Sequence, residues 1–325
     1  MRKYQIESEA IKAGIQPKVS KKYNFHQLAE HWIEFHASKK RSMKDDKSIL
    51  NAHLLPFFGK MPLHQITTER INEFERVALR KVSPKTLHNH LTLLNTMLNV
   101  AMDLNWLYIK PKIKKPKLVQ SPYKYLQTKS EIRLFLETAK GFKKGTFEFY
   151  STAIFTGMRA GEIAGLRWND IDLNKRLIRV QRSYDGPTKS GKERVIPILD
   201  SLLPVLKHWR LKNPLQVVFP NSVGNMRQPS DRIFQEVFQR CLKKAGLNRI
   251  KFHDLRHTFA SHWMMNDGSL YRLKDILGHS TIKMTEHYAH LSPYYYQEDY
   301  GRLNYNVGIE LSERVIKLKN KDISS

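Results

Sequence analysis

The stretch HDLRH, residues 253–257, places two histidines four residues apart, with an acidic residue directly after the first. On a helix, His253 and His257 would share one face, and the zinc-protease pattern H-E-x-x-H has this spacing. Arg256 argues against a metal, because its guanidinium keeps its charge and would lie on the same face as a dication. A histidine and an arginine three residues apart suit a phosphate. A capped helix start with a core histidine remains an equal alternative.

Other residues in the chain could also handle an anion. Arg159 follows a Thr-Gly-Met turn at an expected helix start, where free backbone N–H groups and the helix dipole favour negative charge. Glu162, three residues later, can hydrogen-bond and orient that arginine. Downstream, His279 and Tyr288 lie nine residues apart. A lone tyrosine flanked by histidines is usually a packing or surface residue, so no single stretch decides the function.

Helical patterns in the sequence predict the elements that position these groups. Residues 21–109 are expected to form a compact bundle of about four helices, the second of which ends near Pro56. Thr67 is an expected N-cap, and Ser83 with Pro84 is a strong helix start. The residues expected on the buried faces of the last two helices are Ile71, Phe74, Ala78, Leu87, Leu91, Leu94, Leu98 and Ala101.

A basic segment follows the bundle. Residues 110–127 include KPKIKKPKLVQSPYKY, which is rich in lysine and proline and has no acidic residue, so they are expected to form an interdomain linker. A solvated linker and a linker on a phosphate backbone are equally open. The candidate DNA contacts in this part of the chain are Lys114 and Lys115 in the linker, and Lys85 and His88 on the polar face of the fourth helix.

The second domain is expected over residues 128–300, between a short tail at 1–20 and another at 301–325. It is predominantly helical, but RLIRVQRSYDGPTKSGKERVIPI predicts a β-hairpin with a Gly/Pro/Ser-rich tip that carries Lys189. Lys192 and Arg194 on this hairpin are candidate DNA contacts, and a solvated strand face is equally plausible for them. The fold class is therefore mainly α with a small β-sheet or hairpin.

The composition indicates the partner. The chain has 325 residues and a formal net charge of +26, from 56 lysines and arginines against 30 acidic residues. A folded protein with this charge most often binds a polyanion, of which nucleic acid is the commonest. Cys241 is the one cysteine, so neither an internal disulfide nor a cysteine-rich zinc module is possible. With no signal peptide or membrane-spanning stretch, we expect a cytoplasmic, nucleoid-associated protein without a membrane partner.

The set of motifs is far more specific than any member. T-G-x-R-x-x-E, a hairpin with T-K-S-G, H-x-x-R, G-H and a tyrosine nine residues later resemble, in order and spacing, the tyrosine recombinase (phage integrase) family. The resemblance implies an N-terminal helical core-binding domain of SAM-like fold and an α+β catalytic domain. It also implies that the two domains clamp double-stranded DNA recombination sites, that the protein assembles as a homotetramer on DNA, and that accessory DNA-bending or directionality proteins are possible partners.

The resemblance also implies roles for single residues. Tyr288 would attack the scissile phosphorus and form a 3′-phosphotyrosyl link, while Arg159 and Arg256 clamp the nonbridging oxygens. Lys189 would protonate the leaving 5′ oxygen as general acid. His253 would accept the phenol proton or hydrogen-bond the phosphate. The remaining expectations are His279 bonding a phosphate oxygen or bracing Tyr288, Glu162 supporting Arg159, His287 and His290 in surface or packing positions, and no metal or cofactor.

Alternatives remain open at this point. A type IB topoisomerase uses similar residues but relaxes DNA without joining two sites. A metal-dependent nuclease built on His253 and His257, or a catalytically silent basic DNA-binding protein, would also fit part of the pattern. Many phage integrases have an additional N-terminal arm-binding domain, which we expect to be absent or reduced here. In the C-terminal tail, an apolar set could dock on a neighbouring protomer or belong to a frayed end; its members are Ile309, Leu311, Val315 and Ile316.

Overall fold

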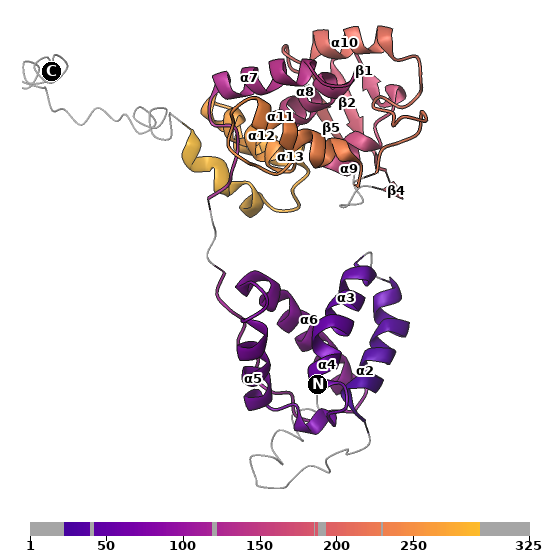
Figure 1. Ribbon diagram of the computed structural model, residues 1–325, viewed down its shortest axis with the longest axis vertical. Helices are drawn as coiled ribbons and strands as arrows, with labels where there is room; N and C mark the ends of the chain where they lie inside the picture. The colour runs from indigo at the N-terminus through magenta and orange to yellow at the C-terminus, as the bar shows by residue number, and fades with distance from the viewer. Residues whose placement is uncertain are drawn as a thin grey trace, which may run out of the picture. The chain divides into compact units, whose positions relative to one another are not determined.

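The chain divides into two compact units, residues 1–121 (unit 1) and residues 122–325 (unit 2). Figure 1 shows α2–α6 in unit 1, and α7–α13 with the strands in unit 2. Both expected tails lie outside the residues described. The computed structural model describes residues 23–39, 42–118, 122–184, 186–187, 193–228 and 230–292.

Unit 1 contains four helical stretches, as the sequence predicts. The first runs from α2 through a π turn and a 3-10 turn, and the second joins α3 to α4 through another π turn. α5 and α6 follow as regular helices. Their bounds are α2 Phe25–His31, π Trp32–His36, 3-10 Ala37–Lys39, α3 Met43–Ile49, π Leu50–Leu54, α4 Leu55–Phe58, 3-10 Leu63–Gln65, α5 Thr68–Ala78 and α6 Pro84–Asp103.

The second stretch ends close to its expected position. The helix was expected to end near Pro56, and it continues two residues further, to Phe58. A proline inside a helix lacks an N–H and its ring crowds the preceding turn. Here the π turn Leu50–Leu54 comes directly before, and the Leu55 N–H bonds to the Leu50 carbonyl across this wider turn. The helical hydrogen bonding is therefore already of the wider π type in the turn that the proline follows.

Predicted helix starts and buried faces in unit 1 are confirmed. The Thr67 and Ser83 side chains accept hydrogen bonds from the backbone N–H groups of Arg70 and Thr86, and Pro84 is the first residue of α6. Each cap satisfies a backbone donor that the first helical turn leaves free. All eight residues expected on the buried faces of α5 and α6 lie in the core of unit 1.

The first part of the predicted linker packs on unit 1. The Lys110 Nζ donates to the side-chain oxygens of Asn95 and Asn99, at 3.2 and 2.6 Å. Farther along, the Pro116 carbonyl lies 3.2 Å from the His88 Nδ1. The Lys110 side chain and the Pro116 carbonyl thus both contact α6, and whether the linker also contacts DNA stays a prediction.

Unit 2 is built from helices around a small sheet, confirming the predicted fold class. Its helices are α7 Lys129–Lys140, α8 Thr146–Thr156, α9 Ala160–Ala164, α10 Leu203–Lys212, α11 Glu236–Lys244, α12 Asp254–Met265 and α13 Leu270–Leu277. Short 3-10 segments cover Trp168–Asp170, Arg232–Phe234, Ile282–Met284 and Glu286–Leu291. The strands are β1 Ile171–Asp172, β2 Leu177–Val180, β3 Arg182–Ser183, β4 Gly186–Pro187 and β5 Arg194–Pro197.

The predicted hairpin is present. β2 and β5 pair antiparallel, with Ile178 opposite Ile196 and Val180 opposite Arg194, and β1 completes the order β1-β2-β5. Ile178 and Ile196 are fully buried in the core of unit 2. Because side chains alternate across a strand, this register fixes which hairpin residues face inward. No helix within the described ranges combines the length and apolarity needed to cross a bilayer.

Candidate active site

A buried carboxylate organises the arginines of unit 2. Glu162 on α9 has a side chain that is 2% exposed, and it accepts hydrogen bonds from the Arg159 backbone N–H and Nη1, at 2.8 and 3.0 Å. The Arg194 Nη1 and Nη2 donate to the same two oxygens, Oε1 and Oε2, at 2.9 and 2.7 Å. Burial opposes ionisation of Glu162, but the bonds and charge of Arg194 and Arg159 outweigh it and lower its pKa. The expected bond between Glu162 and Arg159 is confirmed.

Arg194 differs from expectation. Its side chain is 8% exposed, so the alternative of a solvated strand face is wrong. Besides pairing with Glu162, its Nε donates to the Ile276 carbonyl at 2.7 Å. The guanidinium of Arg194 is bound inside the protein by the Glu162 carboxylate and by a carbonyl at the end of α13. It is therefore not free to contact DNA.

Arg256 joins the ends of two helices. The residue is 4% exposed and lies on α12. Its Nη1 donates to the Gly157 carbonyl at the end of α8, and its Nη2 to the Leu277 carbonyl at the end of α13, at 2.8 and 2.6 Å. Carbonyls in a last helical turn lack intrahelical partners and carry the negative end of the dipole. They therefore stabilise a cation that would otherwise be costly to bury.

Two glycines make these helix ends possible. Gly157 and Gly278 have φ values of +62° and +66°, in the left-handed region that glycine adopts without steric cost. A Cβ at Gly157 would lie 2.6 Å from a ring carbon of Phe259, and one at Gly278 would lie 2.9 Å from the Cδ of Arg194. Both positions therefore combine a required turn with close packing, Gly157 against Phe259 and Leu277 and Gly278 against the Arg194 side chain.

The two predicted histidines lie close enough to the arginines to sense their charge. Burial, and then the charge of Arg256, lowers the pKa of His253 below its ordinary value. The same two causes lower the pKa of His279 to about 4. The His279 Nδ1 lies 2.9 Å from the Thr285 Oγ1, and the Thr285 carbonyl accepts the backbone N–H of Tyr288. His279 thus braces the tyrosine indirectly, through the turn before it.

Tyr288 lies inside this cluster. The residue is 3% exposed, and its hydroxyl is 2.5 Å from the His257 Nδ1. Burial, and then the neighbouring Tyr123, raises the pKa of the phenol, while the charge of Arg256 opposes this rise. His253, which was expected to accept the phenol proton or to hydrogen-bond the phosphate, lies one helical turn earlier, with its ring centroid 5.7 Å from that of His257. The histidine that contacts the phenol is therefore His257.

Sequence reasoning missed His257 and Tyr123 as site residues. His257 was visible as the second histidine of HDLRH, but this position entered only a metal interpretation. Tyr123 lies in the basic segment before the second domain, and no local pattern marks it. Its ring stacks on the His257 imidazole at a centroid distance of 4.2 Å and an interplanar angle of 24°. Only the fold brings residues so far apart in sequence together.

The other predicted residues are scattered. Lys189 and Lys192 lie outside the described part of the chain, so the hairpin amine is not placed relative to the arginines. Lys85 and Lys114 are exposed on unit 1, Lys115 is half-buried, and His88 contacts the linker backbone. Within the described ranges, no group of three or more His, Cys, Asp or Glu side chains is arranged to hold a metal ion.

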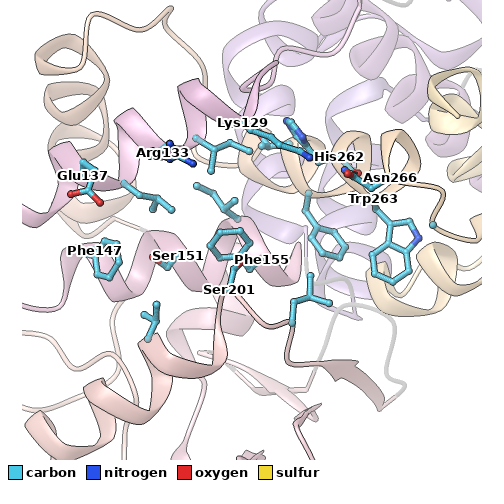
Figure 2. Close-up of a pocket in the computed structure, with 18 residues that line it drawn as sticks. Lys129, Arg133, Glu137, Phe147, Ser151, Phe155, Ser201, His262, Trp263 and Asn266 are labelled. Carbon is cyan, nitrogen blue, oxygen red and sulfur yellow. Dashed lines mark hydrogen bonds between the residues drawn. The ribbon is translucent and has the colours of Figure 1, made fainter. Parts of the chain in front are cut away.

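An apolar groove of about 680 Å³ lies elsewhere on unit 2 (Figure 2). α7, α8 and the second half of α12 line it, with Phe155 and Trp263 among the aromatic side chains and Arg133 and Glu137 on α7. It contains none of the arginine, histidine or tyrosine groups of the cluster described above. The groove is thus separate from the candidate site.

The chain matches two families of domains. Residues 127–294 match the phage integrase family, and residues 24–76 match the N-terminal SAM-like domain of phage integrases. The chain is 29% identical over 252 residues to a "Tyrosine recombinase XerC-like" protein of Caldanaerobacter subterraneus, covering 65% of this chain and 63% of that protein. It is 27% identical to the ICEBs1 integrase of Bacillus subtilis, covering 79% of this chain and 75% of the integrase.

Solved structures agree with this match at the level of fold. The Tn1549 transposon integrase in complex with a circular intermediate DNA has a TM-score of 0.72 at 18% identity, covering 92% of this chain and 99% of that one. A lambda integrase dimer bound to a core site has a TM-score of 0.70 at 18% identity, covering 87% of this chain and 85% of that one. Since the integrase family alone matches more than half of the sequence, the chain belongs to the phage integrase family.

Proposed function

We propose that the protein is a site-specific DNA recombinase that cuts and rejoins strands through a 3′-phosphotyrosyl intermediate, for integration or excision of a mobile element. One observation supports this most. The buried phenol of Tyr288 and the guanidinium of Arg159 both lie close enough to Arg256 to affect its pKa. Glu162 forms an ion pair with Arg159. A nucleophile close to Arg256, which itself interacts with Arg159, fits phosphoryl transfer through a covalent enzyme intermediate, because guanidinium groups stabilise the charge that develops on the phosphate.

Each residue then has a defined task. Tyr288 attacks the scissile phosphorus, and the new ester stores the energy that rejoining later uses. Arg159 and Arg256 bind the nonbridging oxygens, where negative charge builds up in the transition state. His253 and His279 are neutral donors to the phosphate, because their pKa values are lowered. Lys189 on the hairpin tip protonates the leaving 5′ oxygen.

The partner of this site is double-stranded DNA. The net charge of +26 suits a polyanion, and the solved relatives include a lambda integrase tetramer bound to a Holliday junction. We extend both features to this chain as proposals, namely a homotetramer on paired recombination sites and action on the nucleoid. Exposed lysines such as Lys85 and Lys114 would contribute phosphate contacts that carry affinity but no sequence information. Accessory DNA-bending or directionality proteins would act on that assembly.

A suicide substrate tests the proposal. A nicked DNA site from the parent element, incubated with the protein in EDTA, should trap a covalent protein–DNA adduct that maps to Tyr288. Tyr288→Phe should bind the same DNA and form no adduct. Adducts on another residue would overturn the assignment of the nucleophile, and no adduct at all would favour a silent DNA-binding protein. Relaxation of supercoiled DNA by dilute monomer, without joining of two sites, would favour the topoisomerase alternative.

A further inference from the structure

The contact between Tyr288 and His257 is short and protected from solvent. The phenol oxygen lies 2.5 Å from the His257 Nδ1, and the tyrosine is 3% exposed. His257 directly follows Arg256 on α12, so the imidazole that touches the phenol and the guanidinium are held by one helix. A proton acceptor must lie within hydrogen-bonding reach of the proton that it removes. In this structure His257 meets that requirement.

His257 is in the correct protonation state to accept. Burial, followed by the charge of His253, lowers its pKa to about 4; Arg256 acts in the same direction and Asp254 opposes it. At neutral pH the imidazole is therefore uncharged. A hydroxyl can donate or accept, so the direction of this bond depends on the tautomer; with the proton on Nε2, which the role inferred below requires, the Nδ1 lone pair is free. The phenol then donates and the imidazole accepts.

Tyr123 is held over this imidazole by backbone hydrogen bonds of a nearby residue, Leu126. Three residues after it, the Leu126 N–H donates to the Thr258 Oγ1 at 3.1 Å, and the Leu126 carbonyl lies 2.8 Å from the His262 Nε2. Both partners are on α12: Thr258 directly follows His257, and His262 lies just over one turn after it. The segment entering unit 2 is thus fixed along this helix, and the stacking of Tyr123 on His257 follows from that placement.

We propose that His257 is the catalytic proton acceptor for Tyr288 and that Tyr123 is the positioning residue that holds its imidazole. This inference rests on the proposed recombinase function. In the cleavage step the phenol O–H bond breaks and its proton moves to the His257 Nδ1, while the phenol oxygen forms a bond to phosphorus. The bond from phosphorus to the 5′ oxygen breaks, and that oxygen takes a proton from the general acid. Strand rejoining returns the proton from the imidazolium to the phenol.

The protonation states of the pair bear on when the proton can move. The raised pKa of Tyr288 and the lowered pKa of His257 both oppose proton transfer in the free protein. A phosphate bound beside Arg256 adds negative charge near the imidazole and raises its affinity for a proton. The bound phosphate thus raises the pKa of the imidazole, which is the direction that acceptance of the phenol proton requires.

The first experiment separates proton transfer from simple hydrogen bonding. Single-turnover cleavage of a suicide substrate is measured for wild type and His257→Gln, whose amide can bond the phenol but cannot take its proton. The rate should fall about 10²–10⁴-fold, as general base loss does, with DNA affinity and melting temperature near wild type. Replacing Tyr288 by a ring-fluorinated tyrosine, whose phenol is more acidic, should restore most of the lost rate. A wild-type rate in His257→Gln, or no recovery with the fluorinated residue, would overturn the role.

Matched variants sharpen the result. His253→Gln changes the neighbouring histidine of the same helix, so its defect should not recover with the fluorinated tyrosine. His290→Gln alters an exposed histidine two residues after the nucleophile and should cleave as wild type does. If wild type forms no adduct, the recombinase proposal itself fails. If wild type and His257→Gln form adducts equally fast, the proposal about His257 fails alone.

Tyr123 has a separate test. Tyr123→Phe keeps the aromatic face and should therefore retain more of the cleavage rate than Tyr123→Ala does. Tyr123→Ala removes the ring that stacks on the imidazole and should slow cleavage about tenfold. The fluorinated tyrosine at position 288 should partly restore Tyr123→Ala, because the loss acts through proton transfer. Equal rates for the phenylalanine and alanine variants would exclude a positioning role.

Discussion

Arg256 illustrates how one side chain can belong both to a reaction and to a fold. Its guanidinium is buried, and two of its N–H groups are bound to carbonyls at the ends of α8 and α13. In the proposed reaction, its remaining donors face the phosphate. Arg159 is different, because its side chain is 24% exposed and its partner is the Glu162 carboxylate. The two arginines therefore should not behave alike when changed.

We expect Arg256→Lys to lower both cleavage and stability. An ammonium keeps the charge but cannot span two helix-terminal carbonyls with a planar fork. Cleavage should fall about 10²–10³-fold, and a carbonyl left without its partner should cost about 1–3 kcal/mol of unfolding free energy. Chemical denaturation and single-turnover cleavage measure the two effects. Arg159→Lys is the matched control and should lose cleavage with little change in stability. Equal unfolding midpoints for Arg256→Lys and wild type would contradict a stabilising role for the bonds from Arg256 to the ends of α8 and α13.

At the scale of elements, the end of α13 is the most informative. Gly278 adopts a left-handed conformation, and two arginines bind the carbonyls just before it, at Ile276 and Leu277. A backbone bond from the His279 N–H to the Lys274 carbonyl closes the same turn. This short helix end therefore holds Arg194, Arg256 and His279 in fixed positions. Small changes in the backbone of this helix end should therefore displace these three side chains.

Gly278→Ala should accordingly reduce both stability and cleavage. A left-handed alanine costs about 1–2 kcal/mol, and its Cβ would also lie 2.9 Å from the Arg194 Cδ. Gly246→Ala is a suitable control, because Gly246 also has positive φ, +67°, but has nothing within 4 Å of an added Cβ. Thermal melting of both variants should show the shared backbone cost. Only Gly278→Ala should lose cleavage as well, and equal cleavage in the two would argue against transmission through Arg194.

Local patterns predicted much of this arrangement and failed where contacts are long-range. Thr67 and Ser83 were predictable as caps because a cap depends on a few adjacent residues. The β2–β5 hairpin was predictable from its turn composition and apolar arms. In contrast, the helix through Pro56 depends on a π turn that no propensity indicates. The burial of Arg194 depends on Glu162, which lies 32 residues earlier, and the stacking of Tyr123 depends on how its segment follows α12.

At the scale of the whole molecule, buried histidines make stability depend on pH. The pKa values of His257, His279 and His90 are lowered to about 4, and that of His253 is lowered as well, with burial the first cause in each. Between about 4 and the ordinary value of 6.5, the unfolded chain therefore binds more protons than the folded one. Stability is complete above that window and is lost as the pH falls through it.

The melting temperature should thus fall between about pH 7 and pH 5, as differential scanning calorimetry at constant ionic strength would measure. Glu162 adds to the loss of stability only at lower pH, because its pKa is lowered from the ordinary value of 4.5 and its contribution is lost as the pH falls below that value. His279→Asn removes one titrating ring and should flatten the dependence. A melting temperature that rises on acidification would contradict the assigned protonation states.

The anchoring of Tyr123 has a practical consequence for anyone who isolates the catalytic half. The family match begins at residue 127, which would be the natural place to cut the gene. A fragment that starts there lacks both the aromatic ring over His257 and the Leu126 backbone groups that bond to Thr258 and His262. Its low activity would then be mistaken for dependence on unit 1. Starting the fragment at Pro122 keeps those groups and avoids the confusion.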